Sequence, residues 1–141
     1  MKKLACLSLL LLLVGFSSLC FADSVIPNLV GTWIVKAEGG VLLKGSDPGA
    51  LTHHKGEFSS LEAEAVVTKQ QGRVLHGTFK SPRATEKFIA VIGHDNETLY
   101  YADQDGFIEG FIEDNDTIEI VYRHISPNDI VVGVGTWNRK K

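Results

Sequence analysis

The three residues Gly31-Thr32-Trp33 open the first run of β-branched residues that follows the N-terminal segment, and Gly135-Thr136-Trp137 repeats them near the other end of the chain. Each copy lies among valine, isoleucine and threonine residues of the kind that favours β-strands. We interpret the two copies as parts of the first and last strands of a sheet that closes on itself. The two strands are then neighbours.

Alternating runs of β-branched and aromatic residues continue between these two segments, and turn residues separate the runs about every ten to twelve positions. No stretch between them shows the sustained 3.6-residue apolar period of an amphipathic helix. The pattern therefore predicts eight strands. Their expected ranges are 29–38, 61–68, 73–80, 87–93, 98–102, 107–113, 117–124 and 130–139.

Two of these strands have unusual patterns. After Gly39-Gly40, residues 41–43 either extend the first strand or begin a short partner strand. Strand 87–93 has apolar residues at both alternating sets of positions, so we expect both of its faces to be buried.

Short turns join nearly all of these strands, and short turns place consecutive strands antiparallel. An open eight-stranded meander would leave two unpaired edges, which closure of the last strand onto the first removes. The sequence therefore predicts an all-β fold, an eight-stranded antiparallel up-and-down β-barrel closed by its first and last strands. The alternative is a two-layer sandwich, for which only the long irregular segment 44–58 could supply a crossing connection.

Residues 1–22 have the features of a cleaved signal peptide. Lys2 and Lys3 give a positive start, an apolar stretch follows over 7–16, and Cys20-Phe21-Ala22 forms a small-x-small cleavage site. We therefore expect export to the periplasm or the extracellular space. The alternative is a lipoprotein anchored through Cys20. The apolar stretch is shorter than the roughly 20 residues of a membrane span, so no membrane span is expected.

Removal of this segment would leave 141 − 22 = 119 residues, which suits one domain over 23–141. Both cysteines, Cys6 and Cys20, lie in the segment, so neither disulfides nor cysteine-ligated metals are expected afterwards. The loss of two lysines changes the net charge from −3 to 12 − 17 = −5. This acidic balance disfavours nucleic acid as a partner.

Residues 28–33 read Asn-Leu-Val-Gly-Thr-Trp, and their Gly-x-Trp at the start of the first strand resembles that of the calycin superfamily of lipocalins, fatty-acid-binding proteins and avidins. The resemblance implies a barrel closed at one end by Trp33, with a basic residue of the last strand over it. That residue is Arg139, or Lys140 as the alternative. A guanidinium over an indole face also gains a cation–π contact. Gly31, Trp33 and Arg139 are thus expected to form a structural plug.

The ligand motifs of the individual calycin families do not match. Ile34-Val35-Lys36-Ala37 follows the tryptophan where avidins carry a polar biotin contact, and Asn138-Arg139-Lys140 stands where fatty-acid-binding proteins carry Arg-x-Tyr. The Gly-Thr-Trp start also resembles that of small exported bacterial proteins. The resemblance therefore implies the architecture and leaves the ligand open.

The sequence contains no Gly-x-Ser-x-Gly, Cys/His pair or phosphate-binding loop, and no cofactor is expected. His53-His54 with Glu57 comes nearest to a metal cluster, but adjacent histidines need not converge, and no metal is expected. His76, His94 and His124 are scattered, and we expect them on the surface or at the rim of the barrel.

Our first functional hypothesis is a barrel that holds a small apolar or aromatic ligand. The expected inner faces are rich in small residues, which leaves space inside. These residues are Ala63, Ala65, Gly77, Ala90, Gly110 and Gly133. The expected lining residues are Val35, Leu61, Leu75, Phe79, Phe88, Ile118 and Tyr122, with segment 44–58 as a candidate lid.

The second hypothesis assigns binding to the outer surface, where an apolar exterior would be covered by self-association or by a protein partner. Its expected residues are Ile34, Val66, Ile89, Val91, Phe107, Phe111, Val132 and Val134. The third hypothesis is an enzyme of the isomerase or cyclase type. It requires Glu109 to point inward beside Tyr122 and His124, and the facing of strand 107–113 is open in the sequence.

Overall fold

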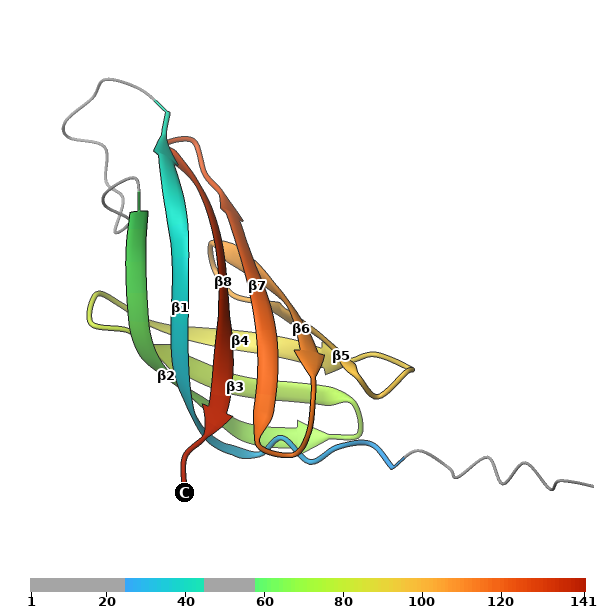
Figure 1. The fold of residues 1–141 in the computed structure, drawn as a ribbon. Helices are drawn as coiled ribbons and strands as arrows, with labels where there is room; N and C mark the ends of the chain where they lie inside the picture. The colour runs from blue at the N-terminus through green and yellow to red at the C-terminus, as the bar shows by residue number, and fades with distance from the viewer. Residues whose placement is uncertain (1–24, 45–57) are drawn as a thin grey trace, which may run out of the picture.

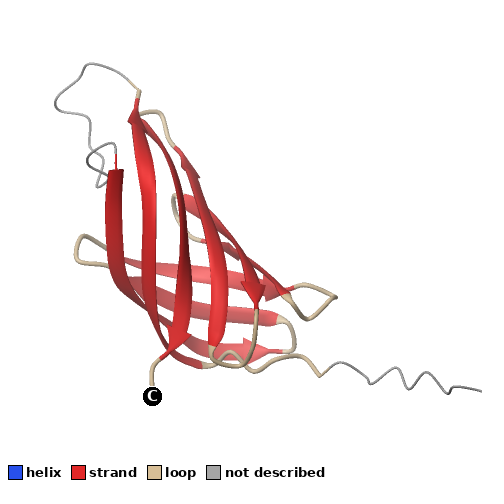
Figure 2. Cartoon of the chain, in the orientation of Figure 1, coloured by secondary structure: helices blue, strands red, loops and turns tan. Residues whose placement is uncertain are grey.

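The computed structural model describes residues 25–44 and 58–141, and it places them in one closed barrel of eight strands (Figure 1). No helix occurs among these residues (Figure 2). The strands are β1 (Gly31–Leu43), β2 (Phe58–Gln71), β3 (Val74–Lys80), β4 (Thr85–Ile92), β5 (Thr98–Ala102), β6 (Gly106–Ile112), β7 (Thr117–Ile125) and β8 (Asp129–Arg139).

Every strand pairs antiparallel with its neighbour in sequence, and β8 returns to pair with β1. Val35 stands opposite Trp137 in that closing pair, and Trp33 stands opposite Arg139. The predicted up-and-down barrel is therefore confirmed, and the two-layer sandwich is wrong.

Strand β1 is one continuous strand that runs through Gly39-Gly40, and residues 41–43 extend it. Of the two alternatives for residues 41–43, extension of the first strand is the one that the structure has. A Cβ atom on Gly39 would lie 2.3 Å from the carbonyl oxygen of Val132 on β8. Glycine at this position therefore permits the close approach of two paired strands.

The outer face of β4 is exposed, so the expectation that both faces of this strand are buried is wrong. Phe88, Ala90 and Ile92 point into the core, whereas Ile89 and Val91 are 47% and 41% exposed. An isolated barrel has no second layer to cover its outer face, so apolar outward residues on β4 remain in contact with solvent.

Strand β6 turns Ile108, Gly110 and Ile112 inward and leaves Phe107 and Phe111 outside. The room inside the barrel next to β6 is too small for large side chains. A Cβ atom on Gly110 would already lie 3.1 Å from the side chain of Ile118 and 3.3 Å from that of Leu99. The larger phenylalanine and glutamate side chains of β6 therefore lie on the outer face.

The two ends of the barrel differ. At one end, which we call the closed end, β1 begins and β8 finishes, and Lys140 N–H donates to the carbonyl of Thr32. We call the opposite end, where β1 finishes and β8 begins, the mouth. The turns between β3 and β4, β5 and β6, and β7 and β8 surround it (Figure 1).

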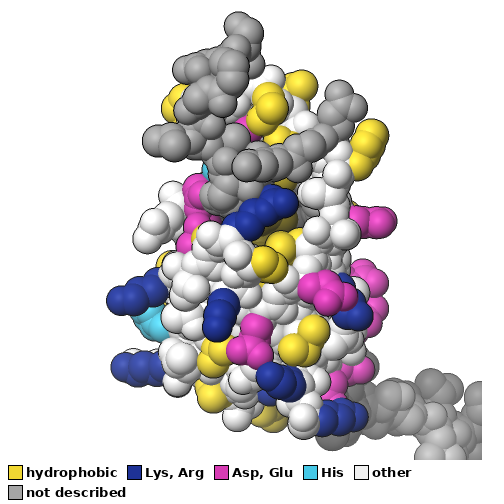
Figure 3. Space-filling view, turned by 90° about the vertical axis from the view of Figure 1, so that its left-hand side faces the viewer, with side chains coloured by type: hydrophobic (Ala, Val, Ile, Leu, Met, Phe, Trp, Pro, Cys, Tyr) yellow, Lys and Arg dark blue, Asp and Glu magenta, His cyan; other side chains and the backbone are white. Residues whose placement is uncertain are grey.

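The predicted signal peptide and most of the candidate lid lie outside the described residues. Within the part of the chain that the structure describes, no helix is long and apolar enough to span a membrane. On the face drawn in Figure 3, charged side chains of both signs alternate with scattered hydrophobic ones.

Candidate functional site

The closed end is filled by Trp33, which is fully buried and donates its indole N–H to the carbonyl of Leu29 over 3.0 Å. The Arg139 guanidinium lies over this ring, with Cζ 4.3 Å from the centroid. Gly31 makes room for it, because a Cβ atom there would lie 2.9 Å from Arg139 Nη1. Lys140 pairs instead with Glu64 at 2.9 Å.

Four further contacts hold the Arg139 side chain in place. Nη1 donates to the Val30 carbonyl at 2.9 Å and Nη2 to the Asn28 carbonyl at 3.0 Å. Nε donates to the Asn115 carbonyl at 2.7 Å and lies 3.1 Å from an oxygen of Asp116. The residue thus joins three segments that are far apart in the sequence.

The barrel interior contains a pocket of about 260 Å³ that opens at the mouth. Its wall is largely apolar and comes from several strands. The apolar and aromatic lining residues are Val35, Ala37, Leu61, Phe79, Pro82, Tyr101, Ile108, Ile120, Tyr122, Val131 and Val132. We call this space the mouth pocket.

The seven residues predicted to line a cavity fall into two groups. Val35, Leu61, Phe79 and Tyr122 line the mouth pocket. The other three are buried in the packed layer of the core and do not line it. These three are Leu75, Phe88 and Ile118.

Three aromatic rings form a packed cluster next to the mouth pocket. Phe88 lies 4.6 Å from Tyr101 between ring centroids, and Trp137 meets Tyr101 edge-on at 5.9 Å. Tyr101 itself lines the pocket. The Trp137 side chain is 1% exposed, and its Nε1 donor has no hydrogen-bond partner among the described residues.

Carboxyl groups gather on one side of the mouth. Glu86 points inward from the start of β4, and Asp103 and Asp105 belong to the turn between β5 and β6. Asp103 accepts hydrogen bonds from the Tyr101 hydroxyl and the Gly106 N–H, both at 2.7 Å. The carboxyl group of Glu86 interacts with those of Asp105 and Asp103.

Burial raises the pKa of Glu86 to about 7, and the negative charges of Asp105 and Asp103 act in the same direction. Burial and the neighbouring Asp103 also raise the pKa of the Tyr101 hydroxyl. Tyr101 therefore stays neutral and acts as a hydrogen-bond donor, whereas Glu86 exchanges its proton near neutral pH.

This carboxyl group was missed in the sequence. We expected the fourth strand to begin at Lys87, which placed Glu86 in a loop. The usable signal was the alternation itself, because Glu86 has the same parity as Phe88 and Ala90, two residues that were expected to face inward.

A second buried polar group lies where β7 meets β8. His124 Nε2 is 2.8 Å from Asp129 Oδ1, and the two side chains are 4% and 1% exposed. The Ser126 hydroxyl donates to the same carboxylate oxygen. His124 lies near the mouth end of β7 but is buried, so the expectation that it is a surface residue is wrong, whereas His76 and His94 are exposed as predicted.

The enzyme hypothesis requires Glu109, Tyr122 and His124 to converge, and the structure does not meet this requirement. Glu109 is on the outer face of β6, where it pairs with Arg123 at 3.1 Å. Tyr122 and His124 lie on the inner face of β7, with their rings stacked at 6.5 Å. The barrel wall separates the carboxylate from the two rings.

The candidate metal residues His53, His54 and Glu57 lie outside the described residues. Within the described part of the chain, no group of three or more His, Cys, Asp or Glu side chains could hold a metal ion. The carboxyl groups at the mouth are therefore not arranged as a metal centre.

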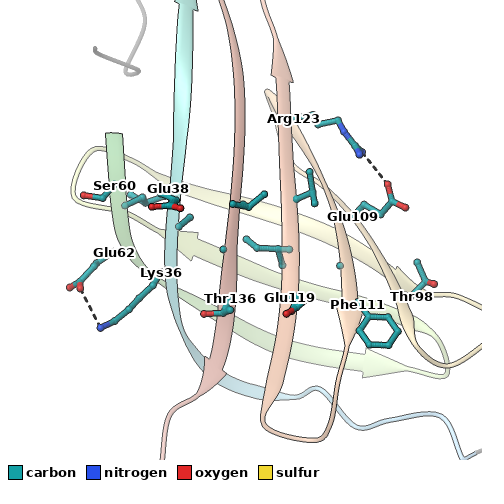
Figure 4. A pocket seen from close by; sticks show the side chains of 17 residues that line it. Lys36, Glu38, Ser60, Glu62, Thr98, Glu109, Phe111, Glu119, Arg123 and Thr136 are labelled. Carbon is teal, nitrogen blue, oxygen red and sulfur yellow. Dashed lines mark hydrogen bonds and ion pairs between the residues drawn. The ribbon is translucent and has the colours of Figure 1, made fainter. Parts of the chain in front are cut away.

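A broad depression of about 970 Å³ lies on the outer surface across β1, β2, β5, β6, β7 and β8 (Figure 4). Four of its charged side chains form two ion pairs. Lys36 lies 3.5 Å from Glu62, and Arg123 lies 3.1 Å from Glu109. All four side chains are more than half exposed, and such pairs contribute at most about 1 kcal/mol. The depression is a solvated surface, unlike the enclosed mouth pocket.

No family model matches the chain, and no curated protein matches it. Among solved structures, a redesigned β-barrel is similar to it, with a TM-score of 0.50 at 10% sequence identity. The similarity covers 80% of this chain and 92% of the other. The fold and the pocket thus define a small eight-stranded β-barrel that is open at one end. At this low identity the likeness extends to the fold alone.

Proposed function

We propose that this chain is an exported, calycin-like barrel that binds a small apolar or aromatic ligand in the mouth pocket and has no enzymatic activity. The observation that carries the proposal is an apolar pocket inside the barrel whose other end is filled by Trp33. Ligand sites are typically concave, mostly apolar and supplied with a few polar groups. The mouth pocket has this character.

The size of the pocket limits the ligand. Typical ligand pockets measure about 300–1,000 Å³, and an apolar cavity of about 150 Å³ suffices for benzene. At about 260 Å³ the mouth pocket suits a compact ring compound better than a long acyl chain.

The proposal can be tested by titrating tryptophan fluorescence with neutral aromatic alcohols such as 2-phenylethanol. Ala37 lines the pocket, whereas Ala102 has its side chain on the outer face of β5. Ala37→Leu is expected to weaken binding about tenfold by filling the pocket, and Ala102→Leu to leave it unchanged. Absence of saturable binding, or equal effects of the two variants, would refute the proposal.

The second candidate function is binding of a protein, or of a second copy of the chain, through the outer surface. It is favoured by the exposure of large apolar side chains, with Phe107 67%, Val132 55% and Val134 52% exposed. Sedimentation at micromolar concentration tests it. An association that Phe107→Ser abolishes supports this function, and a strict monomer counts against self-association.

A further inference from the structure

We propose that the ligand of the mouth pocket is an organic amine, a small aromatic or apolar molecule whose ammonium group is held by the carboxyl groups of Glu86 and Asp103. This inference rests on the proposed function, since it concerns the same pocket, and it adds a charged head group to the ligand.

The charge of the pocket lining favours a cation. Five charged residues line the mouth pocket, and four of them are acidic, although Glu62 is paired with Lys36 on the outer surface. Only Arg83, on the turn between β3 and β4, is basic. Apolar walls keep water away from the inner carboxyl groups, which strengthens their attraction to an entering cation. An anionic ligand would instead be repelled.

The positions of the carboxyl groups also suit an ammonium group. Asp103 is fixed by the Tyr101 hydroxyl and by the Gly106 N–H. The negative charges of Asp105 and Asp103 act on Glu86 and disfavour its ionised form. An ammonium group carries three donors and a positive charge, so it can offset this repulsion and satisfy several carboxylate oxygens together.

A divalent metal is the other cation that carboxylates attract. Among residues 25–44 and 58–141, no three acidic or histidine side chains meet as a metal site requires. The apolar wall supplied by residues such as Leu61, Ile108 and Ile120 also has no use in binding a bare ion. It suits the ring or hydrocarbon part of an amine.

The test compares three probes of nearly the same shape by calorimetry at pH 8, which lies above the pKa of Glu86. The probes are 2-phenylethylamine, 2-phenylethanol and 3-phenylpropionate. We expect the amine to bind at least about tenfold more tightly than the alcohol, and the carboxylate to bind most weakly. Glu86→Gln should bring the ratio of amine to alcohol affinity close to one. Glu109→Gln, outside the barrel, should keep the wild-type ratio.

The outcomes separate this inference from the proposed function. Equal binding of amine and alcohol, or tighter binding of the carboxylate, overturns the amine inference while the binding function stands. A preference for the amine that survives in Glu86→Gln also overturns the role given to this carboxyl group. Binding of none of the three probes overturns both the inference and the function on which it rests.

Discussion

Arg139 and Trp33 face each other across the pair of strands that closes the barrel, with the guanidinium carbon 4.3 Å from the centroid of the indole. The two residues lie over 100 positions apart in the sequence, so this contact forms only when β8 has returned to β1. Trp33 fills the closed end, and Arg139 joins it to the segments on either side.

We predict that Trp33→Ala lowers the free energy of unfolding by about 3–5 kcal/mol, because it removes a fully buried aromatic side chain from the core. Phe107→Ala is the matched control, since this aromatic residue lies on the outer face and is 67% exposed. It should cost less than about 1 kcal/mol. Chemical denaturation measures both, and an equal loss in the two variants would mean that Trp33 is not a core residue.

Arg139→Lys should lower the free energy of unfolding by about 1–2 kcal/mol even though the charge is kept. A lysine cannot reach the carbonyls of Asn28, Val30 and Asn115 at the same time, as the planar guanidinium does. The control is Lys140→Arg, at an exposed ion pair with Glu64, which should change stability little. An Arg139→Lys variant as stable as the wild type would contradict the stabilising role of the guanidinium hydrogen bonds to the three carbonyls.

The stability of the folded chain should depend on the ionisation of Glu86. The folded-state pKa is raised from 4.5 to about 7, so the folded chain holds a proton that the unfolded chain has lost between these values. The contribution of Glu86 to stability is therefore present below about pH 4.5 and falls as the pH rises to about 7.

Glu86→Gln removes this dependence on pH. The free energy of unfolding of the variant, relative to that of the wild type, should therefore be higher at pH 8 than at pH 5. Solvent screening at the mouth limits the gain to the order of 1 kcal/mol. Urea denaturation at the two pH values measures it. Wild type and variant curves that differ by the same amount at both pH values would show that Glu86 titrates normally.

Asp129→Ala should lower the free energy of unfolding by about 2–4 kcal/mol, because it leaves the buried His124 ring and the Ser126 hydroxyl without their shared acceptor. The double variant His124→Ala/Asp129→Ala tests the coupling. Because the buried histidine is then also removed, the loss should be smaller than the sum of the two single losses. Strict additivity would contradict an energetic link between the pair.

Much of the fold can be predicted from period-two alternation and turn chemistry. The strands came out in the right number and order because Gln71-Gly72 and Gln104-Asp105-Gly106 are turn residues between alternating runs. The sequence leaves the role of Gly39 open for a physical reason. A glycine that ends a strand and a glycine that lets two strands approach look the same until the partner strand is known.

The polar groups of the mouth were harder to predict. Whether Glu86 faces inward depends on whether β4 begins before this residue, because only then does the alternation of the strand include it. The contact between His124 and Asp129 depends on the length of the turn between β7 and β8, since both residues must occupy inner positions at the ends of their strands. Register and turn length of this kind are set by tertiary pairing, which a single sequence does not display.

The most direct test of ligand binding inside the barrel is an NMR titration of the methyl groups with a neutral aromatic ligand such as indole. Leu61, Ile108 and Ile120 line the mouth pocket, whereas Ile89, Val91 and Val134 lie on the outer face. We predict saturable shifts of the first three signals, with the outer three unchanged. Shifts confined to the outer methyl groups, or no shifts at all, would contradict binding inside the barrel.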